Sequence, residues 1–228
     1  MLVTTQHRFT AVPRLCADKF MKEFEHLGNI GLGVWHYGYY IDDKLASVLS
    51  FGVPCFSPKR SFLHVITSSY DLRLLQLCRG GTADWAPKNT PSHTIGLALH
   101  EIQKCFGCSL IVAYADPSIG EIGTIYQSCN AVYTGWTNPK GQANYIIGGK
   151  HMSGWSVRKL YGTRDRLQLR ALFPDMIIEP LIPKLRYVLV AAPKSLKKII
   201  INEMSTITLP YLSRKDLHMP SMHDFFLI

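Results

Sequence analysis

Asp116 stands just after an apolar run, Ser109 to Ala113 (SLIVA), where a buried strand would reach the edge of its sheet. Ligands of open α/β sheets bind at this end of the strands. Partial burial raises the pKa of a carboxyl group, so Asp116 is expected to act as a general base. The alternative is structural, because Asp-Pro-Ser also forms an Asx turn before a helix.

Tyr126 lies about one turn into GEIGTIYQSCN (residues 120–130), a segment predicted to be helical. If this helix packs beside the strand, the phenol and the Asp116 carboxylate face one cleft and form an acid/base pair. The alternative is an ordinary core aromatic with its hydroxyl at a rim, since Ile122, Ile125 and Cys129 are close in sequence.

His36 and Tyr37 occur in VWHYGYY, the first strand of a predicted hairpin with its tip at residues 41–44. Successive side chains of a strand point to opposite faces, so only one of the two can face the cleft unless a bulge intervenes. A half-buried histidine with a hydrogen-bond partner is the structural alternative for His36.

Several chemistries lack their motifs. The chain has no GxxxxGK[ST] or GxGxxG loop for nucleotides, no GxSxG nucleophile elbow and no HExxH zinc helix. The single CxxC pair, Cys105 and Cys108, has no second pair to complete a structural zinc site. Nucleotide hydrolysis, serine hydrolysis of the elbow type and zinc proteolysis are therefore unsupported.

The elements that must position these residues alternate along the chain. Strands are predicted in the hairpin, at 72–78, at 109–113, in a second hairpin that turns at Gly148-Gly149, and in LRYVLVAA. Helices are predicted at 14–27, 90–106 and 120–130, and the first of them places Leu15, Phe20, Phe24 and Leu27 on one apolar stripe. This order predicts a mixed α/β fold with a central mixed sheet and helices on both faces. We expect a single domain over residues 1–228, with a basic C-terminal portion, 138–228, packed on that domain or extending it.

The chain is basic, with 25 Lys and Arg against 16 Asp and Glu and a net charge of +9, which favours polyanionic partners. Residues 151–228 hold 12 basic and 6 acidic side chains, and one segment interleaves cations with Trp155 and Tyr161. Five side chains are expected to contact nucleic-acid phosphates: Arg158, Lys159, Arg164, Arg166 and Arg170. A solvated charged face is the alternative.

Cysteine usage and hydropathy bear on location. Six cysteines among apolar residues, and an N-terminus without an apolar leader, predict a reducing cytoplasm. No run approaches the roughly 20 apolar residues that cross a bilayer, so no membrane partner is expected. The assembly state is open, with a homodimer as one expectation.

Residues 114–135, YADPSIGEIGTIYQSCNAVYTG, resemble the signature of the Mom DNA-modification proteins of bacteriophages. Further matching segments are LLQLCRG, APKNTPSHTIGLAL, GKHMSGWSVRKLYGT and LRYVLV, so the resemblance covers most of the chain beyond residue 30. The Mom family is similar to GCN5-related N-acetyltransferases, which implies a central sheet with two strands splayed apart to admit a cofactor. The resemblance implies substrate or cofactor contacts for His36, Tyr37, Arg79 and Ser92, and catalytic roles for Arg79, Ser92, Asp116 and Tyr126.

The resemblance implies carbamoylmethylation of the N6 amine of adenine in duplex DNA, which protects phage DNA from restriction nucleases. The N6 lone pair is delocalised into the ring, so a base must take the proton during attack, and Asp116 is the candidate. Tyr126 would supply a proton or hydrogen bond, and the adenine must leave the base stack to reach such a cleft. Two alternatives stay open: an N-acetyltransferase that acts on a small amine or peptide, and a DNA-binding module without chemistry.

The resemblance also implies acetyl-coenzyme A or a related donor, and suggests iron, for which His36 and Tyr37 are acceptable ligands. Three points bear on these expectations. Arg79-Gly80-Gly81 and the loop to Ser92 do not repeat the spacing with which acetyltransferases cradle a pyrophosphate. Glu121 stands where the family usually has histidine. Plain acetyl transfer would leave an amide on N6, whereas a carbamoylmethyl group joins the nitrogen to a methylene carbon.

Overall fold

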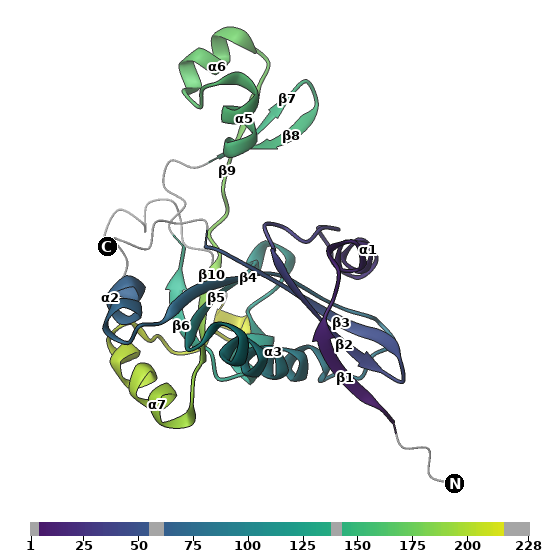
Figure 1. Cartoon of the computed structure of the whole chain (residues 1–228). Coiled ribbons are helices and arrows are strands. Elements are labelled where there is room, and N and C mark those ends of the chain that lie inside the picture. The colour runs from purple at the N-terminus through teal and green to yellow at the C-terminus, as the bar shows by residue number, and fades with distance from the viewer. Residues whose placement is uncertain (1–4, 55–61, 138–142, 217–228) are drawn as a thin grey trace.

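Seven strands form one mixed sheet and three shorter strands form a second sheet in the computed structural model, which describes residues 5–54, 62–137 and 143–216. The main sheet has the order β1-β2-β3-β4-β5-β10-β6, and the small sheet has the order β8-β7-β9. Figure 1 shows the small sheet and two helices as a lobe that stands apart from the main body. The main sheet combines parallel and antiparallel neighbours, which confirms the predicted mixed α/β class.

The N-terminal part of the main sheet is antiparallel. It consists of β1 (His7–Ala11), β2 (Trp35–Ile41) and β3 (Lys44–Gly52), with α1 (Arg14–Phe24) after β1. The predicted hairpin is confirmed, and its two-residue turn holds Asp42 and Asp43 at φ 46° and 60°. Aspartate tolerates this left-handed region better than most residues, which is why two aspartates can close so tight a turn.

A parallel pair lies at the centre of the sheet. β4 (Arg73–Thr82) and β5 (Ser109–Ala115) are joined by α3 (Thr90–Phe106). Their register runs from Arg73 opposite Ser109 to Gln76 opposite Val112. Beyond that point β4 continues beside β3 and β5 continues beside β10, so the two strands splay apart toward their carboxyl ends. This splay is the feature that the family resemblance implied.

The other elements of the main body complete the sheet beyond β5. A 3-10 turn (Pro117–Ile119) and α4 (Thr124–Ser128) lead into β6 (Val132–Trp136), and β10 (Leu185–Ala191) pairs antiparallel between β5 and β6. The remaining helices are α2 (Phe62–Ser69), α7 (Lys194–Glu203) and two short 3-10 turns at Met204–Ile207 and Arg214–Asp216.

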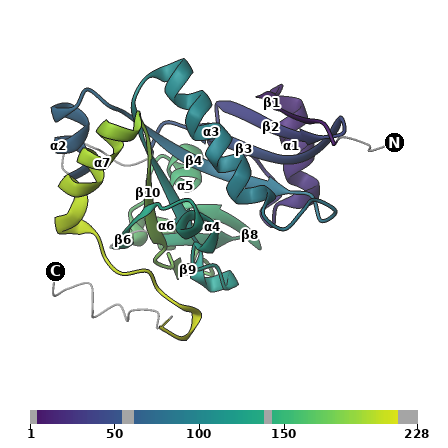
Figure 2. The same cartoon turned by 90° about the horizontal axis from the view of Figure 1, so that it is seen from below.

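Helices cover both faces of the main sheet, because successive side chains of each strand point to opposite faces. Leu49 shares a core with the inner side of α3, whereas its neighbour Val48 packs with α1 on the opposite face. Figure 1 shows α1 and α3 on opposite sides of β2 and β3. α2 and α7 share a core with Leu110 and Val112 of β5, on the face away from α3, and Figure 2 shows these two helices side by side.

The lobe interrupts the chain between β6 and β10. β7 (Ala143–Ile147) pairs with β8 (Lys150–Ser153) through the predicted Gly148-Gly149 turn, and with β9 (Ile177–Pro180) on its other edge. α5 (Gly154–Tyr161) and α6 (Arg166–Leu172) close a core of its own: Ala143, Tyr145, Ile147, Val157, Leu169 and Met176. The C-terminal portion is therefore divided, because β10 and α7 return to the main body.

Two helix predictions are wrong in detail. Leu15 was placed on the buried stripe of α1 but is 85% exposed, and the helix buries Ala17, Phe20 and Met21 instead. Residues 120–130 are helical only within α4, because Gly120 and Gly123 adopt φ values of 80° and 74° that interrupt the helix. Across residues 5–54, 62–137 and 143–216, every helix is too short or too polar to span a lipid bilayer.

Candidate active site

A cavity of about 310 Å³ opens where β4 and β5 part. Its walls come from elements that are far apart in the sequence: the splayed strands β4 and β5, the end of α1, α4 and the start of β10. The lining residues are Glu25, His26, Leu27, Gln76, Leu77, Cys78, Arg79, Gly80, Tyr114, Asp116, Glu121, Tyr126 and Lys184. Three predicted site residues, Arg79, Asp116 and Tyr126, therefore meet at one cavity.

Asp116 directly follows β5. Its carboxylate both forms the Asx turn and faces the cavity, the two alternatives that the sequence left open. Its Oδ1 accepts hydrogen bonds from the Ser118 amide at 3.1 Å and from the Ser118 hydroxyl at 2.5 Å, which is the Asx turn. Its Oδ2 lies 3.0 Å from Nζ of Lys184 and lines the cavity. The turn thus fixes one carboxylate oxygen and leaves the other to a cation in the cavity wall.

The ionisation of Asp116 differs from the sequence prediction. Burial alone would raise the pKa of this carboxyl group, as predicted, but the hydrogen bonds from Ser118 and Lys184 and the charge of Lys184 outweigh burial. The pKa of Asp116 therefore lies below its ordinary value, and the group is a carboxylate at neutral pH. It can accept a hydrogen bond at any neutral pH, but it binds a proton weakly.

Tyr126 is positioned by a turn anchored on Tyr187, a fully buried residue of β10. The Tyr187 hydroxyl donates to the carbonyl of Ile122 at 2.5 Å, and Gln127 Nε2 donates to the Tyr187 hydroxyl at 3.1 Å. Gly123 makes this close approach possible, because a Cβ there would lie 2.3 Å from the Tyr187 ring. α4 consequently begins at a fixed place beside β5, with Tyr126 over the splay.

The Tyr126 phenol is a neutral donor. Burial is the largest cause that raises its pKa, and the charges of Glu121 and Cys129 raise it further, with Arg79 opposing them. Its hydroxyl lies 3.4 Å from the carbonyl of Tyr114, which is long for an O–H···O hydrogen bond. The phenol proton is therefore held loosely by the protein and can turn to a ligand in the cavity.

Arg79 lies within β4 and reaches the cavity beside the end of α1. Its Nη1 donates to the carbonyl of Cys78 at 2.7 Å, and its Nε lies 3.8 Å from Oε1 of Glu25. That distance allows attraction but no hydrogen bond, and among the described residues the buried Nε has no hydrogen-bond partner. The Glu25 side chain is only 6% exposed, so Arg79 and Glu25 compensate each other in the cavity wall.

Lys184 and Glu121 are site residues to which sequence reasoning assigned no role. Lys184 reaches Asp116 because β10 runs antiparallel to β5, with Leu185 opposite Ala115, and so begins where β5 ends. Antiparallel pairing of the apolar runs of β5 and β10 is the signal in the sequence that could have identified Lys184 as a site residue. Glu121 accepts a hydrogen bond from the Asp116 amide at 3.2 Å, so the residue that replaces the family histidine still supports the strand end.

His36 and Tyr37 point to opposite faces of the sheet and lie outside the cavity lining. His36 Nδ1 lies 2.9 Å from Ser50 Oγ on the α1 face; burial, then the charge of Arg14, lowers the pKa of His36. Tyr37 belongs to the α3-face core and stacks on Phe9, and burial, then the charges of Cys105 and Glu101, raises the pKa of Tyr37 to about 12. The regular alternation of β2 separates the two side chains, so they do not meet as ligands of one ion.

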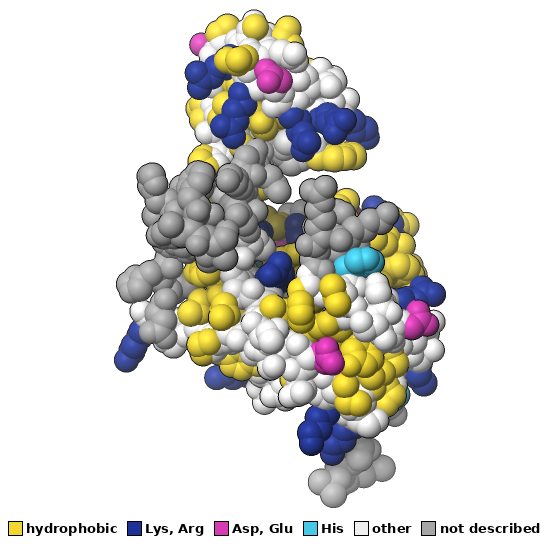
Figure 3. Space-filling view, turned by 90° about the vertical axis from the view of Figure 1, so that its left-hand side faces the viewer, with side chains coloured by type: hydrophobic (Ala, Val, Ile, Leu, Met, Phe, Trp, Pro, Cys, Tyr) yellow, Lys and Arg dark blue, Asp and Glu magenta, His cyan; other side chains and the backbone are white. Residues whose placement is uncertain are grey.

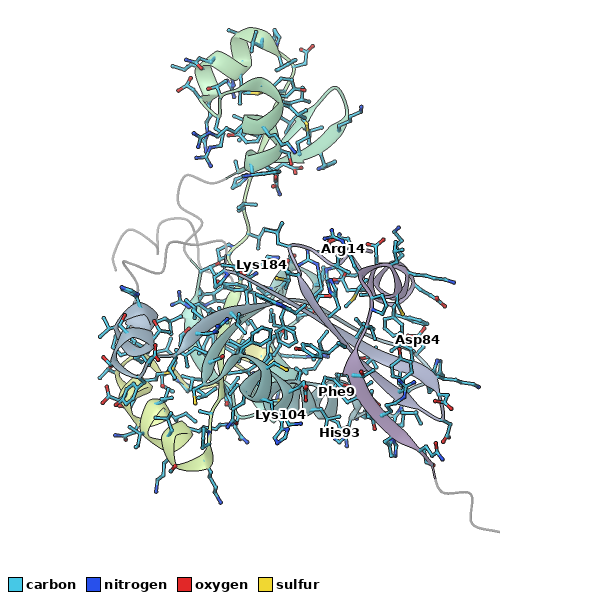
Figure 4. The ribbon with its side chains drawn as sticks, in the orientation of Figure 1. Phe9, Arg14, Asp84, His93, Lys104 and Lys184 are labelled. Atoms are coloured by element: carbon cyan, nitrogen blue, oxygen red, sulfur yellow. The ribbon has the colours of Figure 1, made fainter. Side chains whose placement is uncertain are left out.

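Ser92 is also separate from the other site residues. It lies in the first turn of α3, where its Oγ donates to the carbonyl of Asn89 at 3.0 Å. It lines a different depression of about 840 Å³ between α3, the end of α4 and the start of α7. Figure 4 shows Lys184 at the side of the main body nearest the lobe, and His93, the neighbour of Ser92, at the opposite side.

The described residues show neither the usual pyrophosphate cradle of acetyltransferases nor a metal site. Arg79, Gly80 and Gly81 pair with β3 instead of turning into a helix. In the first turn of α3 the Thr90 amide is already bonded to Pro87 at 2.9 Å, and Pro91 has no N–H, so a pyrophosphate cradle of free amides is missing. Within the described ranges, His, Cys, Asp and Glu side chains form no group of three or more that could hold a metal ion.

The five cations predicted to contact DNA are all exposed on the lobe. Arg158 and Lys159 lie on α5, and Arg166 and Arg170 lie on α6, with Arg164 between the helices. Figure 3 shows Lys and Arg side chains on the lobe, including the side toward the main body, and a hollow between the lobe and the main body. Of the two interleaved aromatics, Trp155 is exposed, whereas Tyr161 packs on Phe173 with ring centres 4.8 Å apart.

Comparison with known proteins gives one family and distant structural likenesses. The Mom protein family matches residues 6–209. No curated protein sequence matches the chain.

Solved structures that are similar to the chain include the following three. A putative arylalkylamine N-acetyltransferase of the yellow fever mosquito is 8% identical over 81% of this chain and 87% of its own, with a TM-score of 0.42. The N-acyl amino acid synthase FeeM from uncultured soil microbes is 10% identical over 82% and 92%, with a TM-score of 0.36. A putative acetyltransferase of Acinetobacter baylyi is 11% identical over 84% and 97%, with a TM-score of 0.40.

Proposed function

The chain belongs to the Mom protein family, and we propose that it modifies the N6 amine of adenine in duplex DNA by carbamoylmethylation, which would protect phage DNA from restriction nucleases. The family supports phage DNA modification in general. The finer proposal is carried by one observation, the convergence of Asp116, Tyr126 and Arg79 on a cavity between the splayed strands.

The size of the cavity favours one extruded base as the substrate. At about 310 Å³ it lies at the lower end of the range for small-molecule sites. A duplex cannot enter such a space, so the adenine must be rotated out of the helix, as in other enzymes that act on a base. The cost of extrusion, a few kcal/mol, has to be offset by contacts to the rest of the DNA.

Asp116 is proposed to accept the N6 proton. Because the hydrogen bonds from Ser118 and Lys184 and the charge of Lys184 hold the carboxylate ionised, Asp116 is a weak base and cannot remove a proton from a resting amine. The amine becomes acidic only as its bond to the methylene carbon forms and positive charge develops on nitrogen. The proton therefore passes to Asp116 during bond formation, and before that the carboxylate orients the amine by a hydrogen bond.

Tyr126 and Arg79 are proposed to act on the other side of the reacting atoms. As the N6–carbon bond forms, the bond between the methylene carbon and its leaving group in the donor breaks, and the leaving group departs with the electron pair. The neutral phenol donates a hydrogen bond or proton to that leaving group. The Arg79 guanidinium lies in the same wall and stabilises negative charge that develops there. A thioester reacts at its carbonyl carbon and would leave an amide on N6, so an acyl-coenzyme A-related donor belongs to the N-acetyltransferase alternative. Labelled donor incubated with the protein, with and without duplex DNA, would test it.

The exposed cations of the lobe are proposed to hold the duplex. Within the described residues, no carboxylate forms a salt bridge with Arg158, Lys159, Arg164, Arg166 or Arg170. Cations without an acidic partner release counterions when they meet phosphates, which makes binding strong at low salt and weak at high salt. A homodimer stays an expectation, which sedimentation with and without DNA would test.

Mass analysis of nucleosides from expressing cells tests the proposed function. DNA from cells with the wild-type protein should yield a deoxyadenosine that is heavier by the carbamoylmethyl group, and Asp116→Asn should abolish this product. Asp84→Asn is the matched control, because Asp84 is an exposed carboxylate outside the cavity lining. Unmodified deoxyadenosine throughout, with folded wild-type protein present, would refute the proposal. Acetylation of small amines without DNA would favour the N-acetyltransferase alternative instead.

A further inference from the structure

An exposed stripe on α5 has no part in the cavity or in the core of the lobe. It consists of Trp155, Arg158 and Lys159, which recur at three- and four-residue spacing, with Val157 buried between them. Trp155 is 69% exposed, and Nζ of Lys159 lies 5.3 Å from the centre of its ring. A large planar apolar side chain held in water beside cations is typical of an interaction site.

Trp155 is not needed to fold the lobe. The lobe core is formed by six other residues, and the second aromatic of the segment, Tyr161, packs on Phe173. α5 itself begins with a side-chain cap, since Ser153 Oγ accepts from the Ser156 amide at 3.1 Å. A substitution at Trp155 should therefore change what the lobe binds and leave its fold in place.

Charge identifies a nucleic acid as the occupant of this stripe. The lobe, residues 143–180, carries six Lys and Arg and three Asp and Glu, and no acidic residue lies in α5. Two of the three acids are engaged: Asp165 caps α6 through the amides of Leu167 and Gln168, and Glu179 lies 3.5 Å from His151. A tryptophan flanked by cations that form no salt bridge with the described residues complements stacked bases between phosphates.

The root of the lobe borders the cavity. Thr137 and Lys184 exchange two hydrogen bonds, from the Thr137 amide to the Lys184 carbonyl at 2.7 Å and from the Lys184 amide to Thr137 Oγ1 at 2.8 Å. The side chain of the same Lys184 lines the cavity and pairs with Asp116. Figure 1 shows α5 on the side of the lobe nearer the main sheet, with α6 farther away.

We propose that Trp155 inserts into the base stack of the duplex beside the extruded adenine, with Arg158 and Lys159 on the flanking phosphates. This inference rests on the proposed function, because extrusion of a base leaves a gap in the stack. A planar side chain that fills the gap replaces lost stacking and offsets part of the cost of extrusion. The lobe then both holds the duplex and stabilises its opened form.

Two duplexes of one sequence test the insertion, one intact and one with a tetrahydrofuran abasic site at its centre. The wild-type protein should bind the abasic duplex more tightly by between about 5-fold and about 150-fold, because its gap is already open. Trp155→Ala should bind both duplexes equally, and Trp155→Phe should keep part of the preference. Arg158→Gln should weaken both alike and reduce the salt slope by about 1. Leu167→Ala, at an 80% exposed residue of α6, is the matched control with an unchanged preference.

Retention of the preference by a folded Trp155→Ala variant overturns the insertion. Two further results would overturn the insertion, provided that Trp155→Ala binds both duplexes as the wild type does. If Trp155→Ala converts a dimer to a monomer, a second copy of the chain occupies the stripe. If Trp155→Ala loses binding to anionic lipid vesicles, a membrane occupies it. Nucleoside analysis separates the two proposals. If the wild type modifies DNA and Trp155→Ala modifies it equally well, only the insertion fails, whereas an absence of modified nucleoside from wild type refutes the proposed function.

Discussion

The Asp116–Lys184 pair sets the chemistry of the candidate site at the scale of single residues. A carboxylate 3.0 Å from an ammonium group and bonded twice to Ser118 is charged, oriented and only weakly basic. Such a group suits a reaction in which the substrate amine becomes acidic on attack. Lys184 can also bind the departing group when Asp116 has taken the proton, because its cation then lacks a partner.

Replacement of Lys184 by Met should move the acid limb of the activity profile to higher pH. Without the cation, the burial that raises the pKa of Asp116 is less opposed, so the pKa rises. The carboxyl group is protonated below its pKa, and activity is then lost at a higher pH than in the wild type. The amount of product nucleoside, measured from pH 4 to pH 8, checks this shift. Lys104→Met is the control, because Lys104 is an exposed lysine of α3.

Protein stability should report the same linkage. In the wild type the folded pKa of Asp116 lies below its unfolded value, so the carboxylate stabilises the fold above the unfolded pKa and the benefit is lost as pH falls through the folded pKa. In urea unfolding, the free energy of unfolding of Lys184→Met should fall less with decreasing pH than that of the wild type. If activity and unfolding of Lys184→Met depend on pH in the same way as those of the wild type, the assigned pairing of Asp116 with Lys184 is wrong.

Replacement of Tyr126 by Phe should lower the rate of modification by on the order of 100-fold, because the neutral donor is removed and the ring is kept. DNA affinity should stay the same, since the phenol lies in the cavity and the cations lie on the lobe. Tyr211→Phe is the matched control: its hydroxyl donates to the carbonyl of Ala131 at 2.7 Å, outside the cavity lining. Equal losses in both variants would mean that Tyr126 has only a structural role.

The position of Asp116 was open to prediction from sequence, but its basicity was not. An apolar run followed by Asp-Pro marks a strand end, and a local pattern is enough to find it. The cation that controls the carboxylate, Lys184, is distant along the chain and arrives through the antiparallel pairing of β10 with β5. The sequence displayed burial and the Asx turn with Ser118, which act on the pKa in opposite directions, but it did not display the Lys184 cation that adds to the lowering.

At the scale of elements, the active-site geometry depends on the turn between β5 and α4. Gly120 and Gly123 adopt φ values of 80° and 74°, but only Gly123 meets another side chain closely. The sequence predicted one continuous helix from 120 to 130, because the spacing of Ile122, Ile125 and Tyr126 fits a helical face. Tertiary contact with Tyr187 decides otherwise, and no local pattern contains that contact.

Gly123→Ala should destabilise the protein more than Gly120→Ala. Both substitutions place a Cβ in the left-handed region, which costs roughly 1–2 kcal/mol. At Gly123 the new Cβ would also lie 2.3 Å from the Tyr187 ring, whereas at Gly120 no heavy atom of the described residues lies within 4 Å. The overlap should add about 1–3 kcal/mol.

Urea unfolding of the two glycine variants measures this difference directly. Because Tyr126 follows the turn, Gly123→Ala should also reduce modification of DNA, while Gly120→Ala keeps most of it. Equal stability losses would show that the Tyr187 contact does not constrain α4.

At the scale of the whole molecule, the lobe is the part that the sequence predicted least. The Gly148-Gly149 hairpin was visible, but β9 is a four-residue strand that ends at Pro180, too short for a periodic signal. Its pairing with β7 is therefore knowable only from the fold. The excess positive charge of the C-terminal third was visible in composition, yet its division between the lobe and the returning β10 and α7 was not.

Excision of the lobe should leave a folded main body that has lost its hold on DNA. Thr137 and Lys184 are joined by two hydrogen bonds, so a short Gly-Ser loop in place of residues 138–183 can connect them without strain. The residues of the three main-body cores all lie outside the excised segment, so unfolding should stay cooperative. If the five lobe cations each contact one phosphate, the logarithmic salt dependence of DNA affinity should fall by about 4.5. Unchanged affinity and salt dependence would place the DNA-binding surface on the main body, and a shortened protein that does not fold would show that the lobe is part of the main core.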